Sequence, residues 1–415
     1  MKTYDLVVIG GGSGGIAAAV SAFDNGVKSI LLLEKEGALG GILLQCIHNG
    51  FGLQTFKEEL TGPEYAYRVA KELLDKGIEY KVNTFVTEIS KDLVVSFTNE
   101  VDGFVQVQAK AIVCATGCSE RTRGAIAIPG DRPTGVMTAG QAQKYLNIEG
   151  YMVGKKVFIL GSGDIGLIMA RRMTLEGAKV LGVAELMPYS NGLNRNIVQC
   201  LNDYNIPLYL SHTVKQIIGH ERLEKIILSK VDEKFNYVPG TEMEIECDTL
   251  LLSVGLIPSN PLLENIGVAI HPRTKGPIVD ESYQTSIPGI FACGNSLHVH
   301  DLVDFVSAEG AKAGAAATHY LKGELNKGDS LSIKTGPGVG YVLPSKANLS
   351  NIEQLAIFFR CSAPHKNCSI KVTSNGEVIK TFKRPYMVPS EMETIKLPVS
   401  LLEEATEINV EVADD

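Results

Sequence analysis

The feature that most constrains the fold of this chain is a strand that runs straight into a glycine-rich turn near the N-terminus. Residues 4–9 form a mostly apolar run of strand length, and the turn after them places Gly10, Gly12 and Gly15 in the pattern G-x-G-x-x-G. The next residues, 16–20, favour a helix. In this context the first glycine permits a tight turn, the second lets the backbone approach a pyrophosphate, and the third lets the helix pack on the strand. The pattern predicts a dinucleotide bound at a helix N-terminus.

An acidic residue follows this turn at the position where such a site needs one. Residues 30–33 form a second apolar run, and Glu34 comes directly after it. A carboxylate at this strand end is placed to accept hydrogen bonds from an adenosine ribose. The residues predicted to bind the first cofactor are Gly10, Gly12, Ser13, Gly14, Gly15, Glu34, Lys35 and Gly41.

The same pattern occurs a second time. Residues 156–160 form a strand of the buried type, a second G-x-G-x-x-G turn starts at Gly161, and a helix is expected over 167–176. Glu185 ends the next apolar run, at the same interval from the first glycine as in the first copy. Two copies with one spacing are more specific than either copy alone. The residues predicted for this second site are Gly161, Gly163, Asp164, Ile165, Gly166 and Glu185.

Size and composition limit the remaining options. A chain of 415 residues is long enough for two or three domains, and 45% hydrophobic with 21% charged residues is typical of a globular protein. The net charge of −8, with basic residues that do not cluster, argues against a nucleic-acid partner. No apolar run has transmembrane length and the N-terminus is unlike a signal peptide, so we expect no membrane insertion and a cytoplasmic location. There the eight cysteines would be mostly reduced.

Further elements are expected around the two sites. A helix is predicted over 63–77, and three strands around 78–90, 93–98 and 104–113 are predicted to form a β-meander. Residues 118–150 contain several Gly and Pro and are expected to connect domains rather than to form a core element.

The C-terminal part has a different pattern. A helix rich in small residues is expected over 302–322, and from about residue 331 the sequence alternates as strands do. Asn375 and Gly376 stand between two such runs, where a type I′ hairpin turn belongs. We therefore expect residues 331–415 to form a small all-β domain.

With these motifs, residues 1–325 resemble the flavoproteins that have two dinucleotide-binding domains, such as glutathione reductase. The marks are the two glycine turns, the Ala115-Thr116-Gly117 crossover and the stretch 289–295. The resemblance implies that the first turn binds FAD and the second binds NAD(P)H. It also implies cofactor contacts from Thr116, Gly117, Gly294 and Asn295. Asn295 stands where the family usually has Asp, and an amide can still hydrogen-bond a ribityl hydroxyl.

The resemblance also implies the architecture. It predicts an α/β fold with two Rossmann-like domains, the second inserted in the first, and a small all-β C-terminal domain. The FAD-binding domain would comprise 1–120 and 270–328, the NAD(P)H-binding domain with its connecting segment 121–269, and the β-rich domain 331–415.

Glu185 favours NADH as the nicotinamide cofactor. A carboxylate there accepts hydrogen bonds from a free 2′-hydroxyl and repels a 2′-phosphate, whereas NADP sites usually supply Arg. The basic residues Arg171 and Arg172 lie on the preceding helix instead of following the strand.

The stretches 44–52 and 297–304 resemble a narrower group, the flavoproteins that accompany anaerobic glycerol-3-phosphate dehydrogenases, which are related to amine- and opine-oxidising flavoprotein subunits. This resemblance implies an electron-transfer role beside a companion dehydrogenase protein; a homo-oligomer is the other expected assembly. The chain departs from the disulfide reductases, because it offers only Cys46 where they carry a cysteine pair. It also lacks their long C-terminal dimerisation domain, and we expect residues 331–415 to dock a partner.

Two groups of side chains are candidates for chemistry. Cys46 and His48 are the predicted catalytic residues, as a reactive thiol beside the flavin, although a thiol that only packs in the pocket is the alternative. His298, His300 and Asp301 raise the question of a metal site. Alternation does not place both histidines on one helical face, so we expect pocket lining or partner contact and no metal.

These inferences converge on an FAD-dependent oxidoreductase that passes a hydride from NADH to the flavin and on to an acceptor or partner protein. A Cys46-assisted NADH oxidase or peroxidase is one alternative. A non-catalytic electron-carrier subunit of a dehydrogenase complex is the other.

Overall fold

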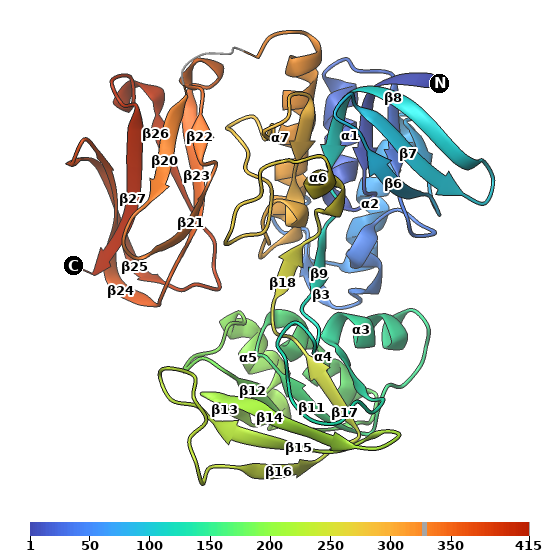
Figure 1. The fold of residues 1–415 in the computed structure, drawn as a ribbon, viewed down its shortest axis with the longest axis vertical. Helices are drawn as coiled ribbons and strands as arrows, with labels where there is room; N and C mark the ends of the chain where they lie inside the picture. Colours follow the sequence, from blue (N-terminus) through green and yellow to red (C-terminus); the bar gives the residue numbers. More distant parts are fainter. Residues whose placement is uncertain (326–329, 415) are drawn as a thin grey trace. The chain divides into compact units, whose positions relative to one another are not determined.

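The computed structural model describes residues 1–325 and 330–414, and the chain divides into two compact units (Figure 1). Unit 1 comprises Met1–Leu44, Asn49–Cys118 and Pro258–Asp415, and unit 2 comprises Gln45–His48 and Ser119–Ile257. Unit 2 is therefore inserted in the sequence of unit 1.

A seven-stranded sheet forms the centre of unit 1. Its strands run in the order β5-β2-β1-β8-β7-β6, and β19 pairs with β8 off this path. Strands β1, β2, β5, β8 and β19 pair in parallel. Strands β2 and β19 and the C-terminal halves of β1 and β8 carry the continuous apolar runs expected of strands buried on both faces, whereas the edge strand β5 is largely exposed. The bounds are β1 Lys2–Ile9, β2 Ile30–Leu33, β5 Glu79–Lys81, β6 Phe85–Ile89, β7 Val94–Asn99, β8 Gly103–Cys114 and β19 Ile290–Ala292.

The predicted meander is correct only in part. Strands β6, β7 and β8 pair antiparallel as a meander, but β5 pairs parallel with β2 at the opposite edge of the sheet. The run 78–90 is thus two strands separated by a turn at Asn83, whose φ is +48°. A crossing from one sheet edge to the other leaves no periodic signal in so short a segment.

Two helices of small residues pack unusually closely on this sheet. Helix α1 (Ser13–Asp24) follows the first glycine turn, and helix α7 (Val303–Leu321) runs against it. A Cβ added at Gly310 would lie 2.1 Å from the carbonyl oxygen of Gly14, and one added at Gly314 would lie 2.1 Å from that of Ala18. These glycines therefore set how closely α7 approaches the first glycine turn.

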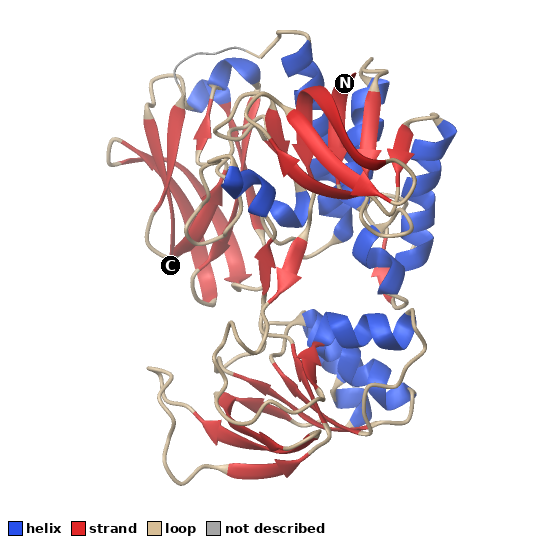
Figure 2. Cartoon of the chain, turned by 45° about the vertical axis from the view of Figure 1, so that its right-hand side comes forward, coloured by secondary structure: helices blue, strands red, loops and turns tan. Residues whose placement is uncertain are grey.

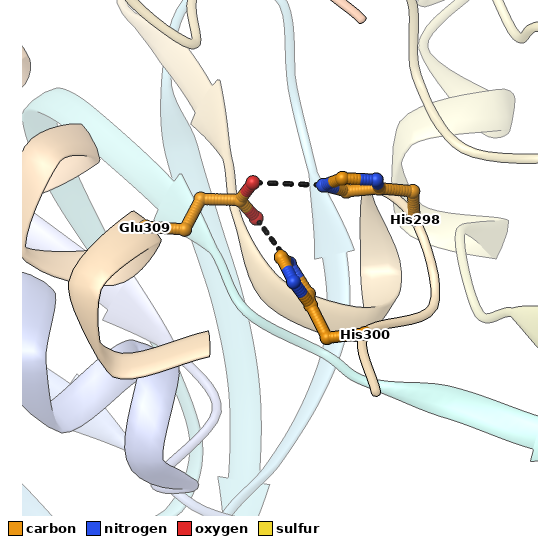
Figure 3. Close-up of side chains that lie close together, drawn as sticks. All are labelled: His298, His300 and Glu309. Atoms are coloured by element: carbon orange, nitrogen blue, oxygen red, sulfur yellow. Dashed lines mark hydrogen bonds and ion pairs between the residues drawn. The ribbon is translucent and has the colours of Figure 1, made fainter. Parts of the chain in front are cut away.

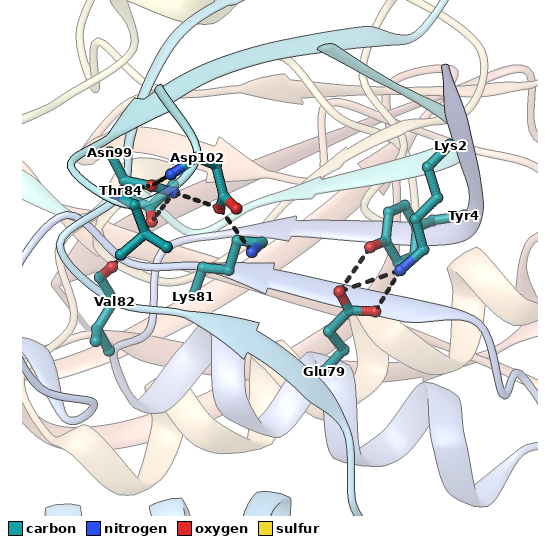
Figure 4. Close-up of polar contacts among 9 residues, drawn as sticks. Lys2, Tyr4, Glu79, Lys81, Val82, Thr84, Asn99 and Asp102 are labelled. Atoms are coloured by element: carbon teal, nitrogen blue, oxygen red, sulfur yellow. Dashed lines mark hydrogen bonds and ion pairs between the residues drawn. The ribbon is translucent and has the colours of Figure 1, made fainter. Parts of the chain in front are cut away.

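Polar side chains fasten the β5 edge of the same sheet (Figure 4). Glu79 of β5 accepts hydrogen bonds from Lys2 at 2.9 Å and from the Tyr4 hydroxyl at 2.8 Å, both on β1. Lys81 lies 2.8 Å from Asp102, at the turn between β7 and β8. These half-exposed pairs contribute little energy each, but they link the edge strand β5 to β1 and to the turn between β7 and β8.

Unit 2 repeats the first pattern with a five-stranded parallel sheet in the order β10-β17-β11-β12-β13 (Figure 2). Its helix α4 (Asp164–Leu175) follows the second glycine turn. A separate three-stranded antiparallel sheet, β14-β15-β16, packs its apolar face in the same unit. The strand bounds are β10 Val136–Thr138, β11 Lys156–Leu160, β12 Lys179–Glu185, β13 Leu208–Leu210, β14 His212–Gly219, β15 Leu223–Lys230, β16 Met243–Glu246 and β17 Thr249–Leu252.

The expectation that residues 118–150 only connect domains is wrong. Strand β10 joins the parallel sheet, and helix α3 (Ala139–Asn147) follows it with Thr138 as its N-cap. Ala139 and Ala142 of this helix are fully buried in the core of unit 2. This helix is difficult to predict because its periodic pattern spans little more than two turns. The glycines and prolines around it also favour the prediction of a loop.

The C-terminal residues of unit 1 fold as two antiparallel-rich sheets, drawn orange to red in Figure 1. The sheets run β22-β20-β27-β24-β25 and β21-β23-β26, and they share one apolar core. Asn375 and Gly376 form the predicted turn between β24 and β25, with φ of +52° and +83° as type I′ requires. The bounds are β20 Leu331–Thr335, β21 Val339–Leu343, β22 Lys346–Ala347, β23 Gln354–Cys361, β24 His365–Ser374, β25 Glu377–Met387, β26 Glu393–Pro398 and β27 Glu407–Asp414.

The fold class is thus as predicted, with two Rossmann-like α/β sheets and a β-rich C-terminal part. In both α/β units the glycine turn lies at the carboxyl end of a central parallel strand, which is where such sheets bind ligands.

Candidate functional site

The first glycine turn has the shape of a phosphate cradle. Gly10 has φ of +110°, and an added Cβ would lie 2.2 Å from the carbonyl oxygen of Ala115. A Cβ on Gly15 would lie 1.9 Å from the carbonyl oxygen of Gly10, whereas one on Gly12 would meet nothing within 4 Å. The outer two glycines are therefore required by the packing of the protein itself. The middle one faces open space, as expected where a pyrophosphate approaches the backbone.

Glu34 supports this turn from behind. Its Oε2 accepts a hydrogen bond from the backbone N–H of Gly11 at 2.6 Å, and its Oε1 accepts one from Glu36 at 2.7 Å. The side chain is buried, and an ionised carboxylate still has lone pairs to offer a ribose after these two bonds. The predicted ribose ligand is thus also the residue that shapes the turn.

The second turn is built in the same way. A Cβ on Gly161 would lie 2.0 Å from the carbonyl oxygen of Ser253, and one on Gly166 would lie 2.7 Å from the Ser253 side chain. Glu185 Oε2 accepts from both the backbone N–H and the hydroxyl of Ser162, at 3.0 and 2.6 Å, and its Oε1 accepts from the backbone of Met187. Gly163 is more confined than Gly12, because its Cβ would lie 3.3 Å from Ser253 Oγ.

Other predicted cofactor residues fall into two groups. Ser13, Gly14 and Gly41 lie at the first turn, where Gly40 donates a backbone hydrogen bond to Gly11 and a Cβ on Gly41 would lie 3.1 Å from Gly12 Cα. Lys35 is different, since its side chain is 67% exposed and lies 4.0 Å from Glu36. Lys35 therefore does not shape the turn.

Asp164 is occupied inside unit 2. Its Oδ1 accepts hydrogen bonds from the backbone of Leu193 at 2.9 Å and from the Asn196 amide at 2.6 Å, which ties α4 to helix α5 (Asn194–Cys200). Ile165, the next residue, packs half-buried against the core of that unit. These two predicted cofactor residues therefore have structural contacts of their own.

The remaining predicted cofactor residues, Thr116, Gly117, Gly294 and Asn295, all form hydrogen bonds within unit 1. The Thr116 hydroxyl donates to the carbonyl oxygen of Ser259 at 2.7 Å, and the backbone of Ser259 donates to Gly117 at 3.0 Å. Gly294 donates its N–H to Glu309 at 2.6 Å, and Asn295 accepts the backbone N–H of His300 at 3.0 Å through Oδ1.

Glu309 is a residue that the sequence analysis does not single out. This residue of α7 brings together His298 and His300, whose Nε2 atoms lie 2.9 and 3.1 Å from its two carboxylate oxygens (Figure 3). Burial alone would raise the pKa of Glu309, but the two histidines hold it well below its ordinary value. Burial lowers the pKa of His298. The sequence signal for a functional role of Glu309 is a glutamate within a helix made largely of Ala and Gly.

Asp301, grouped with these histidines in the sequence, points elsewhere. Its Oδ1 accepts a hydrogen bond from the guanidinium of Arg360, and its Oδ2 accepts the backbone N–H of Met392 at 2.8 Å. The C-terminal strands thus contact the segment next to the two histidines directly.

Cys46 and His48, the predicted catalytic pair, belong to the short segment of unit 2 that interrupts unit 1 in sequence. The Cys46 thiol lies 3.8 Å from Oε1 of Gln143, and burial raises its pKa to about 12. Reactive cysteines have a lowered pKa, so this environment favours a thiol that packs. His48 is half-buried at the end of the same segment. None of the eight cysteines, all of them among the described residues, forms a disulfide.

Comparison with known proteins agrees with this geometry. The family model described as pyridine nucleotide-disulphide oxidoreductase matches residues 4–317, which include both glycine turns. The chain belongs to the pyridine nucleotide-disulphide oxidoreductase family. Members of this family bind FAD and use NAD(P)H, so the protein is an FAD- and NAD(P)H-dependent oxidoreductase.

Individual members of the pyridine nucleotide-disulphide oxidoreductase family are similar at low identity. One of the subunits of opine oxidase from Agrobacterium tumefaciens (strain Ach5) is 27% identical over 353 residues, covering 80% of this chain and 69% of that one. Dihydrolipoyl dehydrogenase of Acholeplasma laidlawii is 28% identical over 351 residues, covering 77% and 97%. The crystal structure of T. acidophilum thioredoxin reductase has 25% sequence identity and a TM-score of 0.62, covering 78% and 99%.

As for membranes, none of the helices in the described part of this oxidoreductase combines the length and the apolar character that a bilayer-spanning segment needs.

Proposed function

We propose that this oxidoreductase takes a hydride from NADH onto FAD and passes the electrons to an acceptor held by a companion protein. The observation that carries the proposal is the repeated arrangement of a glycine turn backed by a buried strand-end glutamate, Glu34 in unit 1 and Glu185 in unit 2. Two such sites in one chain suit two dinucleotides.

The residues at each turn have separate tasks in this proposal. Gly12 leaves room for the FAD pyrophosphate, the N-terminus of α1 supplies N–H groups and a positive dipole end, and Glu34 accepts the ribose hydroxyls. Asn295 would meet the ribityl chain. When bound, FAD supplies the hydride acceptor and NADH the hydride donor. The protein positions both, and the hydride step requires no general acid.

The preference for NADH rests on charge. Glu185 is buried at the strand end of unit 2, where a 2′-phosphate would meet a carboxylate. Two arginines of the preceding helix α4 are already engaged, since Arg171 donates to the hydroxyl of Tyr204 and Arg172 lies 2.6 Å from Glu176. Neither of these two guanidinium groups is available to bind a 2′-phosphate at the end of β12.

Similarity to components of complexes supports a companion protein. Besides the opine oxidase protein, the small chain of glutamate synthase [NADPH] from Mycobacterium tuberculosis (strain CDC 1551 / Oshkosh) is 26% identical over 351 residues. A dehydrogenase of the kind that oxidises glycerol 3-phosphate anaerobically is our candidate partner, with a homo-oligomer as the second arrangement. The free thiols suit a reducing compartment such as the cytoplasm.

The test is anaerobic mixing of the FAD-loaded protein with NADH or NADPH, followed at the flavin absorbance. Rapid bleaching by NADH, and much slower bleaching by NADPH, is expected. Steady-state turnover with a dye, with oxygen and with peroxide then separates the acceptors. Turnover by the dye alone supports a partner protein as acceptor. Turnover by peroxide that is lost in Cys46→Ser supports the peroxidase, and no bleaching by either nucleotide contradicts the hydride step and favours the electron-carrier role.

A further inference from the structure

We propose that His298, His300 and Glu309 form a binding site for one divalent transition-metal ion such as Zn²⁺ or Fe²⁺. The inference is independent of which nicotinamide or acceptor the enzyme uses. It starts from the convergence of two imidazoles on a single carboxylate in the interior of unit 1 (Figure 3).

The spacing of the donor atoms suits one ion. One nitrogen from each histidine and one oxygen from Glu309 lie within 4.8 Å of one another, and the two nitrogens lie 2.9 and 3.1 Å from the carboxylate. Ligand atoms bound at about 2.0–2.2 Å to a shared ion are roughly 3 Å apart. The rings are already grouped, with centroids 4.3 Å apart, so that small side-chain shifts admit the ion.

Burial makes a cation favourable here. The side chains of His298, His300 and Glu309 are 1%, 2% and 4% exposed. A carboxylate removed from water needs a compensating positive charge. The two imidazoles offer ligand atoms to an ion, and a divalent ion supplies positive charge beside the buried carboxylate.

The surroundings of the cluster resemble the outer shell of a metal site. The hydroxyl of Tyr341 lies 3.4 Å from Nδ1 of His298, and Gly294 donates its backbone N–H to Glu309. Such partners orient metal ligands. Nδ1 of His300 is buried with no hydrogen-bond partner among the described residues. The nitrogen of His300 that faces Glu309 is Nε2, so an ion bound there would leave Nδ1 to a water molecule.

The chemical types of the three ligands limit which metal ions this site would bind. Two imidazoles and one carboxylate are the ligands of His₂Glu zinc sites and of non-haem Fe²⁺ sites, whereas Ca²⁺ and Mg²⁺ prefer oxygen alone. The ion would link helix α7, through Glu309, to the segment after Gly294 and Asn295, through His298 and His300. Since Gly310 of that helix packs on Gly14, the site lies close behind the first glycine turn.

The experiment loads the FAD-bound protein with Zn²⁺, or anaerobically with Fe²⁺, removes free ion by gel filtration and measures metal per FAD. About one equivalent is expected, and the extended X-ray absorption of the Zn²⁺ form should show nitrogen and oxygen neighbours at about 2.0–2.1 Å. A sulfur shell at about 2.3 Å would assign the ion to the cysteines and overturn the site.

Variants locate the ion. His298→Ala and His300→Ala should each weaken binding at least tenfold while FAD remains bound. His319→Ala is the matched control, because His319 forms an exposed pair with Glu324 near the end of the same helix, and this variant should bind as the parent does. Less than a tenth of an equivalent with both ions in the parent, or full binding in both histidine variants, overturns the proposal. NADH bleaching of the flavin, measured in parallel, tests the proposed function separately.

Discussion

The carboxylate of Glu34 accepts the backbone N–H of Gly11 at 2.6 Å, and Glu185 repeats this relationship with Ser162 in the second unit. Each strand-end glutamate thus supports the turn in front of it. The shared geometry explains why the interval between first glycine and glutamate is the same in both copies. An extra residue between them would move the carboxylate away from the turn.

Gly12→Val should abolish FAD retention in folded protein. Gly12 has φ of −76°, which valine tolerates, and its Cβ would meet no protein atom within 4 Å, so the branched side chain would occupy only the space of the pyrophosphate. The measurement is FAD per protein after gel filtration, beside Gly124→Val in an exposed turn of unit 2. Full flavin content in a folded Gly12→Val protein would refute the assignment of this turn.

Glu185→Ala should remove the preference for NADH. Each charge-assisted hydrogen bond to the ribose is worth on the order of 1.5–3 kcal/mol, so kcat/KM for NADH should fall at least tenfold while that for NADPH falls less. The ratio of the two kcat/KM values is the quantity to compare. Equal use of both nucleotides by the unmodified enzyme would contradict the role of Glu185.

Gly310→Ala should lower stability and loosen FAD. The added methyl would lie 2.1 Å from the carbonyl oxygen of Gly14, so α7 must move away from the first glycine turn. Overpacking of this kind costs about 1–3 kcal/mol, although alanine favours a helix. The Tm should fall and FAD should be released faster in Gly310→Ala. The control Ala308→Ser, on the exposed face of the helix, should change neither quantity. Unchanged Tm in Gly310→Ala would mean that the helices are not in this contact.

Cys46 should behave as an unreactive thiol. Because burial raises its pKa to about 12, the thiol stays protonated throughout pH 6–9 and thiolate forms only far above that range. Alkylation by iodoacetamide should therefore be slow and rise with pH without levelling off below pH 10. Anaerobic titration should take up one two-electron equivalent per FAD in both the parent and Cys46→Ser. A second equivalent that is lost in Cys46→Ser would reveal a redox partner for this thiol.

Arg360→Met should destabilise the attachment of the C-terminal strands. Arg360 pairs with Asp301, whose side chain is only 17% exposed, and donates to the carbonyl oxygen of Val299 at 3.0 Å. Removing one member of a fully buried pair costs about 3–5 kcal/mol, and this partly buried pair should cost less than that. Calorimetry should show a lower Tm, while Arg384→Met, which breaks the more exposed pair with Glu393, should cost less.

The same contact refines what residues 331–415 do. The sequence pattern predicts a module that docks a partner, and deletion of such a module would leave FAD in place. Arg360 and Tyr341 of these strands reach the segment that follows Gly294 and Asn295. Deletion should therefore weaken FAD retention by a measurable amount, and a truncated protein with unchanged FAD affinity would show that these contacts serve only to attach the C-terminal strands.

Elements whose physics is local are predictable from the sequence. A strand followed by a glycine turn and a helix can be recognised from a dozen residues, because sterics at Gly10 and Gly15 allow little else. The Asn375-Gly376 hairpin is predictable for the same reason, since both residues must adopt positive φ. The repeated interval to Glu34 and Glu185 then predicts that each turn binds a dinucleotide.

Which distant residues meet depends on the tertiary structure. His298 and His300 do not share a helical face, and nothing in the local sequence directs them to Glu309, which reaches them only because α7 folds back beside the segment that carries them. Likewise Arg360 approaches Asp301 only when the C-terminal strands pack on the rest of unit 1. Such contacts depend on the crossing of whole elements, whose positions are set by the summed packing of many side chains rather than by any short pattern.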